Sequence, residues 1–138
     1  MKNKINVFFA LVITIMTIPS CSNAQKGTNS ETIAKNVSVE EFKKLVEANP
    51  KGQIIDVRTP GEYAQGNLKG STLMTIGGEG FNSQLEKLDK KAPVYVYCKS
   101  GGRSGRAMGI MQKMGFTEVY NMNGGMMAWQ RASYPTKE

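Results

Sequence analysis

The feature that most constrains the fold is a short run of β-branched and aromatic residues, Val94–Tyr97 ("VYVY"). A strand that presents apolar side chains on both faces has to be covered on both faces, which is typical of the middle of a parallel sheet. The run stops at Cys98, a glycine-rich segment follows, and a helical pattern extends from Arg103 to Lys113. A buried strand followed by a helix predicts an α/β domain.

The same alternation continues along the chain. Strand-like runs lie at Gln53–Arg58, Ser71–Ile76 and Thr117–Met122. Helical patterns lie at 39–46, 60–66, 82–88 and 124–132, and the first two follow capping boxes that begin at Ser38 and Thr59. The sequence therefore predicts an α/β fold with a central parallel sheet of about five strands, flanked by helices on both faces.

The first twenty residues have the composition of an export signal. Lys2 and Lys4 precede an almost wholly apolar run, Ile5–Ile18, and small residues follow it. A membrane-spanning helix needs roughly 20 apolar residues, so this run is short for a span. We interpret residues 1–20 as a bacterial signal peptide, which places the mature protein in the periplasm or elsewhere in the cell envelope.

Two kinds of processing are compatible with this signal. The segment Ile18–Cys21 ("IPSC") resembles a bacterial lipoprotein box, in which Cys21 is lipidated and anchors the protein to a membrane. Ordinary cleavage after Ser22–Ala24 ("SNA") would release a soluble periplasmic protein. The lipoprotein reading is favoured, because an unpaired cysteine otherwise has no role at this position. Residues 21–36 are polar and small, and predict a flexible tether to a single domain at 37–135.

Composition excludes several classes of function. The net charge is +7, but the lysines are scattered and form no basic stripe with interleaved aromatics, so no nucleic-acid partner is expected. The chain contains no histidine, which excludes a histidine metal site, a histidine base and a serine–histidine triad. We expect a monomer with no metal and no cofactor. The mild positive charge suits a small anionic substrate.

Cys98 is the candidate nucleophile. Glycines such as Gly101 and Gly102 let successive backbone N–H groups turn inward, where they form an anion-binding nest. The helix that follows directs its positive end at the same point, and Lys99, Arg103 and Arg106 add positive charge. All of these effects favour thiolate over thiol, so no general base is needed.

In these features the chain resembles a single-domain rhodanese, which is a sulfurtransferase. Three segments carry the resemblance, and they are "DVRTPGEYAQGNLKGS" at Asp56–Ser71, "CKSGGRS" at Cys98–Ser104, and "NMNGGMMAWQRASYP" at Asn121–Pro135. They follow one another at the family's spacing, and the resemblance covers about residues 36 to 135. One departure is Asn67–Lys69, where the family often has His-Ile-Pro, and it is expected to affect packing.

The resemblance implies a double-displacement reaction. Cys98 would take the outer sulfur of a donor such as thiosulfate, hold it as a persulfide, and pass it to cyanide or a thiol. The implied substrate-binding residues are Lys99, Ser100, Gly101, Gly102 and Arg103, and the implied supporting residues are Asp56, Arg58 and Ser104. Asp56 and Arg58 are expected to form a structural ion pair with each other or with Glu62, and Trp129 is expected in the core.

Two other functions stay open. Phosphatases and arsenate reductases of the related dual-specificity type have a loop one residue longer than the four residues between Cys98 and Arg103, so the count favours sulfur over phosphate. The domain could also be a non-catalytic persulfide carrier or interaction module in the cell envelope. The presence of Cys98 argues against an inert module, but it does not separate a carrier from a catalyst.

Overall fold

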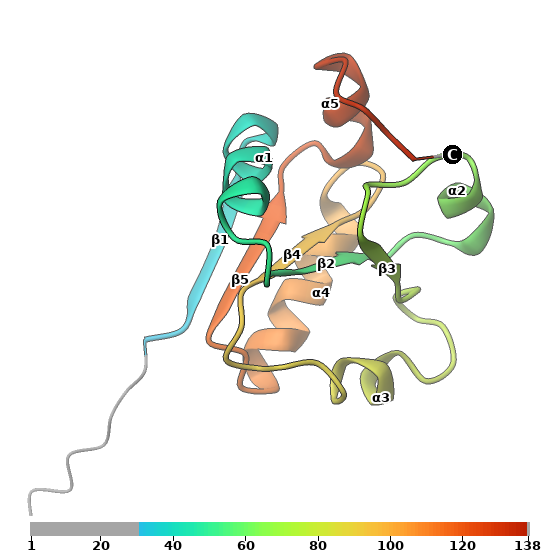
Figure 1. The fold of residues 1–138 in the computed structure, drawn as a ribbon. Helices are drawn as coiled ribbons and strands as arrows, with labels where there is room; N and C mark the ends of the chain where they lie inside the picture. The colour runs from blue at the N-terminus through green and yellow to red at the C-terminus, as the bar shows by residue number, and fades with distance from the viewer. Residues whose placement is uncertain (1–30, 138) are drawn as a thin grey trace, which may run out of the picture.

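The computed structural model describes residues 31–137, and their strands form one parallel sheet (Figure 1). The spatial order is β1-β5-β4-β2-β3, and every neighbouring pair is parallel. The strands are β1 (Ile33–Val37), β2 (Gln53–Asp56), β3 (Ser71–Leu73), β4 (Val94–Tyr97) and β5 (Glu118–Met122). The predicted α/β fold with about five parallel strands is confirmed. The export signal, Cys21 and the first part of the predicted tether lie outside the described residues.

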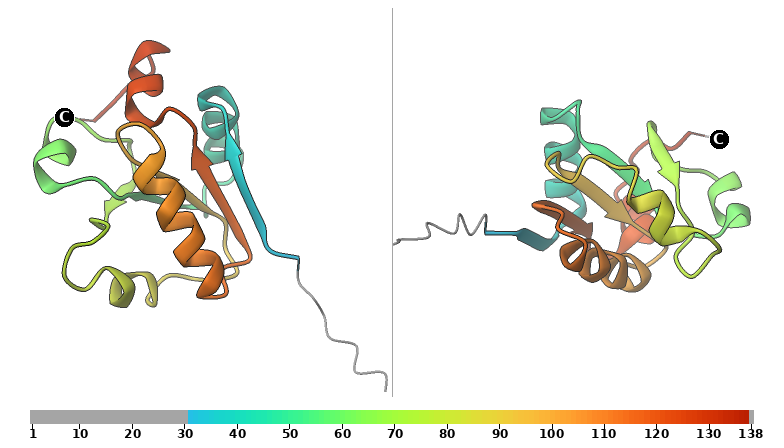
Figure 2. Two further views of the ribbon diagram at one scale, coloured as in Figure 1. Left: turned by 180° about the vertical axis from the view of Figure 1, so that it is seen from behind. Right: turned by 90° about the horizontal axis from the view of Figure 1, so that it is seen from below.

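Helices cover both faces of the sheet, and Figure 2 shows α1 and α4 on opposite sides of it. One face packs against α1 and α5, and the other against α3 and α4. The helices are α1 (Val39–Ala48), α2 (Pro60–Ala64), α3 (Phe81–Leu85), α4 (Gly102–Lys113) and α5 (Gly125–Arg131). Within residues 31–137, none of these helices has the length and apolar character needed to cross a membrane.

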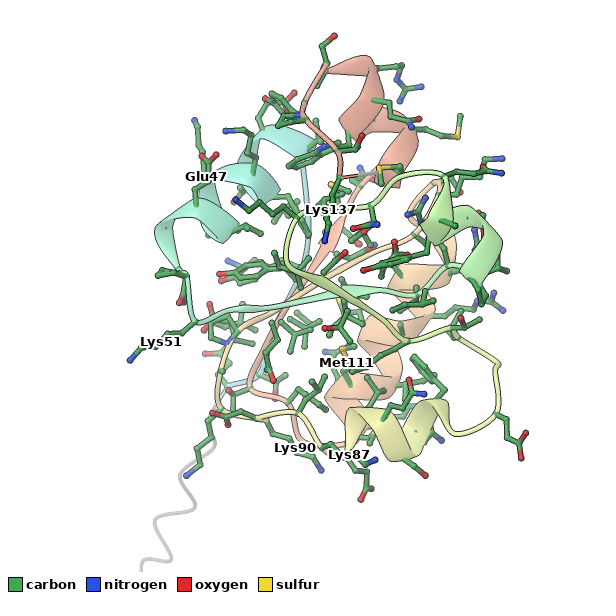
Figure 3. The ribbon with its side chains drawn as sticks, turned by 45° about the vertical axis from the view of Figure 1, so that its right-hand side comes forward. Glu47, Lys51, Lys87, Lys90, Met111 and Lys137 are labelled. Carbon is green, nitrogen blue, oxygen red and sulfur yellow. The ribbon has the colours of Figure 1, made fainter. Side chains whose placement is uncertain are left out.

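Strand β4 is the centre of the core, as its composition predicts. Val94 and Val96 pack with α3 and α4, whereas Tyr95 and Tyr97 pack with α1 and α5. All four side chains are buried. Met111 of α4, labelled in Figure 3, lies in the interior, while the labelled Glu47 and Lys51 project outward. The strand is apolar on both faces because both faces are covered.

The prediction of a flexible tether is wrong for its last residues. Ile33–Asn36 belong to β1, which pairs with β5 over the register Ile33–Glu118 to Val37–Met122. Most of this edge strand is exposed, and it is held by backbone hydrogen bonds to a single neighbour. A strand held in this way needs few apolar side chains, so its composition gave little indication of it.

Strand β3 and helix α3 are also shorter than their sequence patterns predict. Strand β3 ends at Leu73, although Met74 N–H still donates to the Asp56 carbonyl and Ile76 N–H to the Val57 carbonyl. The expected helix through Leu88 ends at Leu85. Strands β4 and β5 end at the carboxyl edge of the sheet, β4 at Tyr97 and β5 at Met122. The loops that leave this edge carry the residues of the candidate site.

Candidate active site

Cys98 lies directly after β4, with its side chain fully buried in the core under α4. The loop that follows turns back at Gly101, whose φ of +100° is a left-handed conformation that favours glycine. This turn brings the Gly101 N–H within 3.1 Å of the Cys98 Sγ. The predicted inward-facing N–H group is therefore present at Gly101.

Ser104 provides a second donor to the same sulfur. It is fully buried in the first turn of α4, and its Oγ lies 3.3 Å from the Cys98 Sγ. The same Oγ lies 3.2 Å from the carbonyl oxygen of Gly101. A hydroxyl has one proton, so it donates to the sulfur or to the carbonyl at any one time.

These groups set the charge of the sulfur. Burial raises the pKa of the Cys98 thiol, but hydrogen bonds from the Ser104 hydroxyl and from the backbone N–H groups of Ser104, Ser100 and Gly101 outweigh burial. The net effect is a pKa below the ordinary value of a thiol. Because the thiolate is the reactive form, Cys98 is prepared for nucleophilic attack in a chain that has no histidine.

A second turn, between β5 and α5, supports the Cys98 loop from outside. The Met126 N–H donates to the Cys98 carbonyl at 2.8 Å, and the Met127 N–H donates to the Lys99 carbonyl at 3.0 Å. Gly125 has a φ of +55°, and a Cβ there would lie 2.5 Å from the Cys98 carbonyl oxygen. The close approach of the two turns therefore requires glycine at this position.

Arg103 pairs with Glu62 of α2 rather than standing free. Its two terminal nitrogens donate to the two carboxylate oxygens at 2.8 and 2.7 Å. The hydrogen bond from Arg103 lowers the pKa of Glu62 to about 2. Glu62 in turn raises the pKa of Arg103, and the Cys98 sulfur adds a smaller effect in the same direction. Arg103 therefore contributes its charge at the loop while Glu62 fixes its position.

Asp56 and Arg58 form a buried pair at the end of β2. The Arg58 Nη2 lies 2.6 Å from one Asp56 oxygen and also donates to the Gly66 carbonyl at 2.8 Å. The Arg58 N–H donates to Asp56 as well. The two side chains hydrogen-bond to each other and to backbone, and the Arg58 guanidinium also lies over the Tyr97 ring, 5.6 Å from its centroid. This is the arrangement expected of a structural ion pair.

Lys99 in the loop and Arg106 in α4 line two different cavities. Lys99 lines a small cavity of about 140 Å³ beside the loop, together with residues of α5 and of the segment after β2, namely Arg58, Glu62, Gln65, Met126, Met127 and Gln130. Ser100 and Gly102 are exposed. Arg106 lines a separate cavity with Phe81 and Ile110, and it is not among the residues that line the cavity beside the loop. The structure thus separates Arg106 from the other two cations.

Comparison with known protein families identifies the domain that carries this site. The family model described as "Rhodanese-like domain" matches residues 38–132, which include the Asp56–Arg58 pair, the whole Cys98 loop and the α5 turn. The chain belongs to the rhodanese-like domain family. The sequence resemblance stated above is confirmed over residues 38–132.

Individual relatives support the same assignment. The rhodanese-like domain is 36% identical to the uncharacterized protein YqhL of Bacillus subtilis over 99 residues, covering 72% of this chain and 75% of that one. It is 31% identical to the thiosulfate sulfurtransferase GlpE of Ectopseudomonas mendocina over 84 residues, covering 61% and 74%. The solution structure of a polysulfide-sulfur transferase homodimer from Wolinella succinogenes matches with a TM-score of 0.64, 32% identity, and coverage of 77% and 78%. These relatives support sulfur transfer as the general chemistry.

Three residues of this rhodanese-like site could not be assigned from the sequence. Glu62 has a capping role that accounts for it locally, and its pairing with Arg103 spans 41 residues of sequence. Gly125 was recognised as part of a family signature, but its contact with the Cys98 loop was not. Asn121 begins the same family segment, but the sequence gives no indication that it donates to the Gly101 carbonyl. Each depends on segments that meet only in the folded sheet.

Proposed function

We propose that this protein is a thiosulfate sulfurtransferase that works through a persulfide on Cys98. The Cys98 thiolate attacks the outer sulfur of thiosulfate, a new S–S bond forms, and the bond to the sulfonate sulfur breaks. Sulfite leaves with that electron pair. In the second half, cyanide or a thiolate attacks the terminal sulfur of the persulfide, and the Cys98 thiolate leaves. The products are thiocyanate or a new persulfide, and both halves conserve charge.

The observation that carries this proposal is the set of donors around the Cys98 sulfur. The Gly101 N–H and the Ser104 hydroxyl lie 3.1 and 3.3 Å from Sγ. Cys98 is a thiolate at the start and at the end of the cycle, and its persulfide is anionic in between. Fixed donors that favour a negative charge on sulfur therefore act in both half-reactions. The name of the relative GlpE supports thiosulfate as the donor.

The cavity beside the loop is suited to a small anion. Its volume of about 140 Å³ is small, and Lys99 contributes a cation with no hydrogen-bond partner or ion pair among the described residues. Arg103 is not among the residues that line this cavity, but it pairs with Glu62, which is one of them. We assign Lys99 to attracting the donor anion, and Arg103 to holding the loop and binding the donor. Lys99, Ser100, Gly101, Gly102 and Arg103 together form the proposed substrate-binding loop.

We further propose that the mature protein is a monomer in the bacterial cell envelope, held to a membrane by a lipid on Cys21. The sequence of the first twenty-one residues motivates this placement. Mass spectrometry of the mature N-terminus checks it. An acylated cysteine as the first residue supports the anchor, whereas a free N-terminus after Ala24 shows ordinary cleavage and overturns it.

A turnover assay tests the enzymatic proposal. Thiosulfate and cyanide are supplied to the wild type and to Cys98→Ser, and thiocyanate is measured. We expect turnover by the wild type and none by the variant. Phosphatase turnover without a Cys98 persulfide would overturn the proposal.

The alternative function is a persulfide carrier or an interaction module that passes sulfur to a partner in the envelope. The same contacts around Cys98 would serve a carrier, because a carrier also stores an anionic persulfide. The two functions differ in rate. A Cys98 persulfide seen by mass spectrometry with negligible thiocyanate formation would favour the carrier.

A further inference from the structure

Asn121 is a buried polar side chain next to the Cys98 loop that the reaction above does not use. It lies in β5 with 3% of its surface exposed, on the α4 side of the sheet. Its Nδ2 donates to the Gly101 carbonyl at 3.2 Å and to the Asn36 Oδ1 at 2.7 Å. Both amide protons thus have acceptors, one in the catalytic loop and one in the edge strand β1.

The orientation of this amide is fixed at a cost. The Asn121 Oδ1 is buried and has no hydrogen-bond partner among the described residues. Turning the amide over would place Oδ1 against the Gly101 carbonyl oxygen, which cannot donate a hydrogen bond, so the orientation with Nδ2 on this carbonyl is the favoured one. An apolar residue would leave no unpaired oxygen there. The amide is therefore better explained by what its Nδ2 holds than by its own contribution to stability.

The group that it holds is the turning point of the loop. Gly101 donates its N–H to the Cys98 Sγ at 3.1 Å, and its carbonyl accepts from the Gly105 N–H at 3.0 Å and from Asn121. Glycine has wide conformational freedom, so an unrestrained Gly101 could turn its N–H away from the sulfur. Fixing the carbonyl side of this residue restricts the direction of its N–H.

A second effect passes through Ser104. Its hydroxyl lies 3.3 Å from the Cys98 Sγ and 3.2 Å from the Gly101 carbonyl, and it has only one proton to give. When Asn121 and Gly105 satisfy that carbonyl, the hydroxyl proton is free to donate to the sulfur. Without Asn121, the carbonyl would compete with the sulfur for this proton.

We propose that Asn121 is a positioning residue for Cys98, and that Asn36 of β1 fixes the orientation of its amide. Acting through Gly101 and Ser104, Asn121 keeps two donors directed at the sulfur. Asn36 stands opposite Asn121 in the β1–β5 register, so the edge strand that the sequence did not predict becomes part of the support of the site. The inference rests on Cys98 being the reacting sulfur.

The test compares Asn121→Leu with the wild type by the pH profile of Cys98 alkylation and by thiosulfate–cyanide kinetics. Leucine has a similar size and no donor. We expect the alkylation midpoint to move to higher pH, and kcat to fall about tenfold with a smaller change in KM, less than the ~10²-fold that a 1 Å misplacement can cost. An unchanged midpoint and an unchanged kcat in a folded variant would overturn the proposal.

A double variant separates positioning from general damage. If Asn121 acts partly by freeing the Ser104 hydroxyl, then Asn121→Leu should have a smaller effect in a Ser104→Ala background than in the wild type. Fully additive effects would contradict this route. Because the alkylation profile needs no turnover, a shifted profile supports the inference even if the protein proves inactive with thiosulfate.

Variants of Asn36 keep the proposal testable if Asn121→Leu fails to fold. Asn36 is exposed, so its replacement leaves no hole in the core. Asn36→Ala should shift the alkylation midpoint in the same direction by a smaller amount. Asn36→Asp keeps the acceptor, so at high salt, where its added charge is screened, it should shift the midpoint less than Asn36→Ala. Lys35→Ala, on the same exposed strand, is the control. Equal profiles for Asn36→Ala and Lys35→Ala would overturn the role of Asn36.

Discussion

The turn between β4 and α4 and the turn between β5 and α5 have the same local construction but hold different acceptors. In each, a glycine in the left-handed conformation precedes the helix, Gly101 in one and Gly124 in the other, and no side chain caps the helix. Four residues separate β4 from α4, and two separate β5 from α5. The N–H groups of the first turn face the Cys98 sulfur, and those of the second face the carbonyls of Cys98 and Lys99.

This difference shows how one loop can bind an anion while its neighbour holds it in shape. A helix N-terminus has free N–H groups that need acceptors. The longer turn, between β4 and α4, leaves room for the Cys98 sulfur as an acceptor. At the shorter turn, between β5 and α5, the acceptors are the backbone carbonyls of Cys98 and Lys99. In the proposed reaction, the first turn therefore acts on the reacting atom, and the second fixes the geometry of the first. Substitutions can test each turn separately.

The largest effect is expected at the contact between the two turns. A Cβ on Gly125 would lie 2.5 Å from the Cys98 carbonyl oxygen and 2.7 Å from the Lys99 carbonyl, which are backbone atoms. Gly125→Ala should displace the loop and lower kcat/KM for thiocyanate formation by ~10²-fold. Gly109→Ala in α4, where a Cβ would meet nothing within 4 Å, is the matched control. Equal activity of the two variants would show that the second turn does not support the first.

The next effect concerns the ion pair that closes the first turn. Arg103→Ala removes a cation from the loop and leaves Glu62 without its partner, so kcat/KM should fall about tenfold. Arg106→Ala removes a charge of the same sign from α4, but Arg106 lines a different cavity and should change kcat/KM much less. Equal losses in both variants would contradict the role assigned to Arg103.

A smaller effect is expected from the Ser104 hydroxyl, which is one of several donors to the sulfur. Ser104→Ala should raise the pKa of Cys98 and reduce kcat about fivefold, a change that corresponds to the net free energy of about one hydrogen bond. The pH profile of alkylation measures the first change, and steady-state kinetics measure the second. Ser83→Ala, at an exposed position in α3, is the control. A profile that does not move would leave Ser104 with a structural role alone.

The smallest effect is on stability in acid. Glu62 has a pKa of about 2 in the fold against an ordinary value of 4.5. Its pair with Arg103 therefore stabilises the protein above pH 4.5, and this stabilisation is lost as the pH falls toward 2. The pair is partly exposed, so the contribution should be below about 1 kcal/mol. Thermal unfolding from about pH 5 to about pH 2 should show a steeper loss of Tm in the wild type than in Glu62→Gln. Parallel curves would contradict this assignment.

The sequence predicted those features that depend on local pattern. Apolar periodicity indicated the helices and the central strands, because burial determines which side chains an element can carry. It missed β1, since Ile33–Val37 is an edge strand held by backbone hydrogen bonds to β5. The Cys98 loop was predicted because its cysteine, glycines and cations are consecutive in the chain.

The rest of the site could not be predicted because it is made by segments that are far apart in sequence. The Glu62–Arg103 pair joins α2 to α4, and the Asn36–Asn121 pair joins the two strands at one end of the sheet order. Gly125 contacts the Cys98 loop only because β4 and β5 are neighbours. Each contact follows from the strand order, which a local pattern does not reveal.

The measurement that tests the central claim most directly is the pH dependence of Cys98 alkylation in the wild type. If the first turn holds an anionic sulfur, as its donors indicate, alkylation should stay fast well below the reference thiol pKa of about 8.5. A neutral alkylating agent keeps the charge of the reagent out of the profile, and Cys98→Ser supplies the background. A profile with its midpoint at the ordinary thiol value would contradict the account.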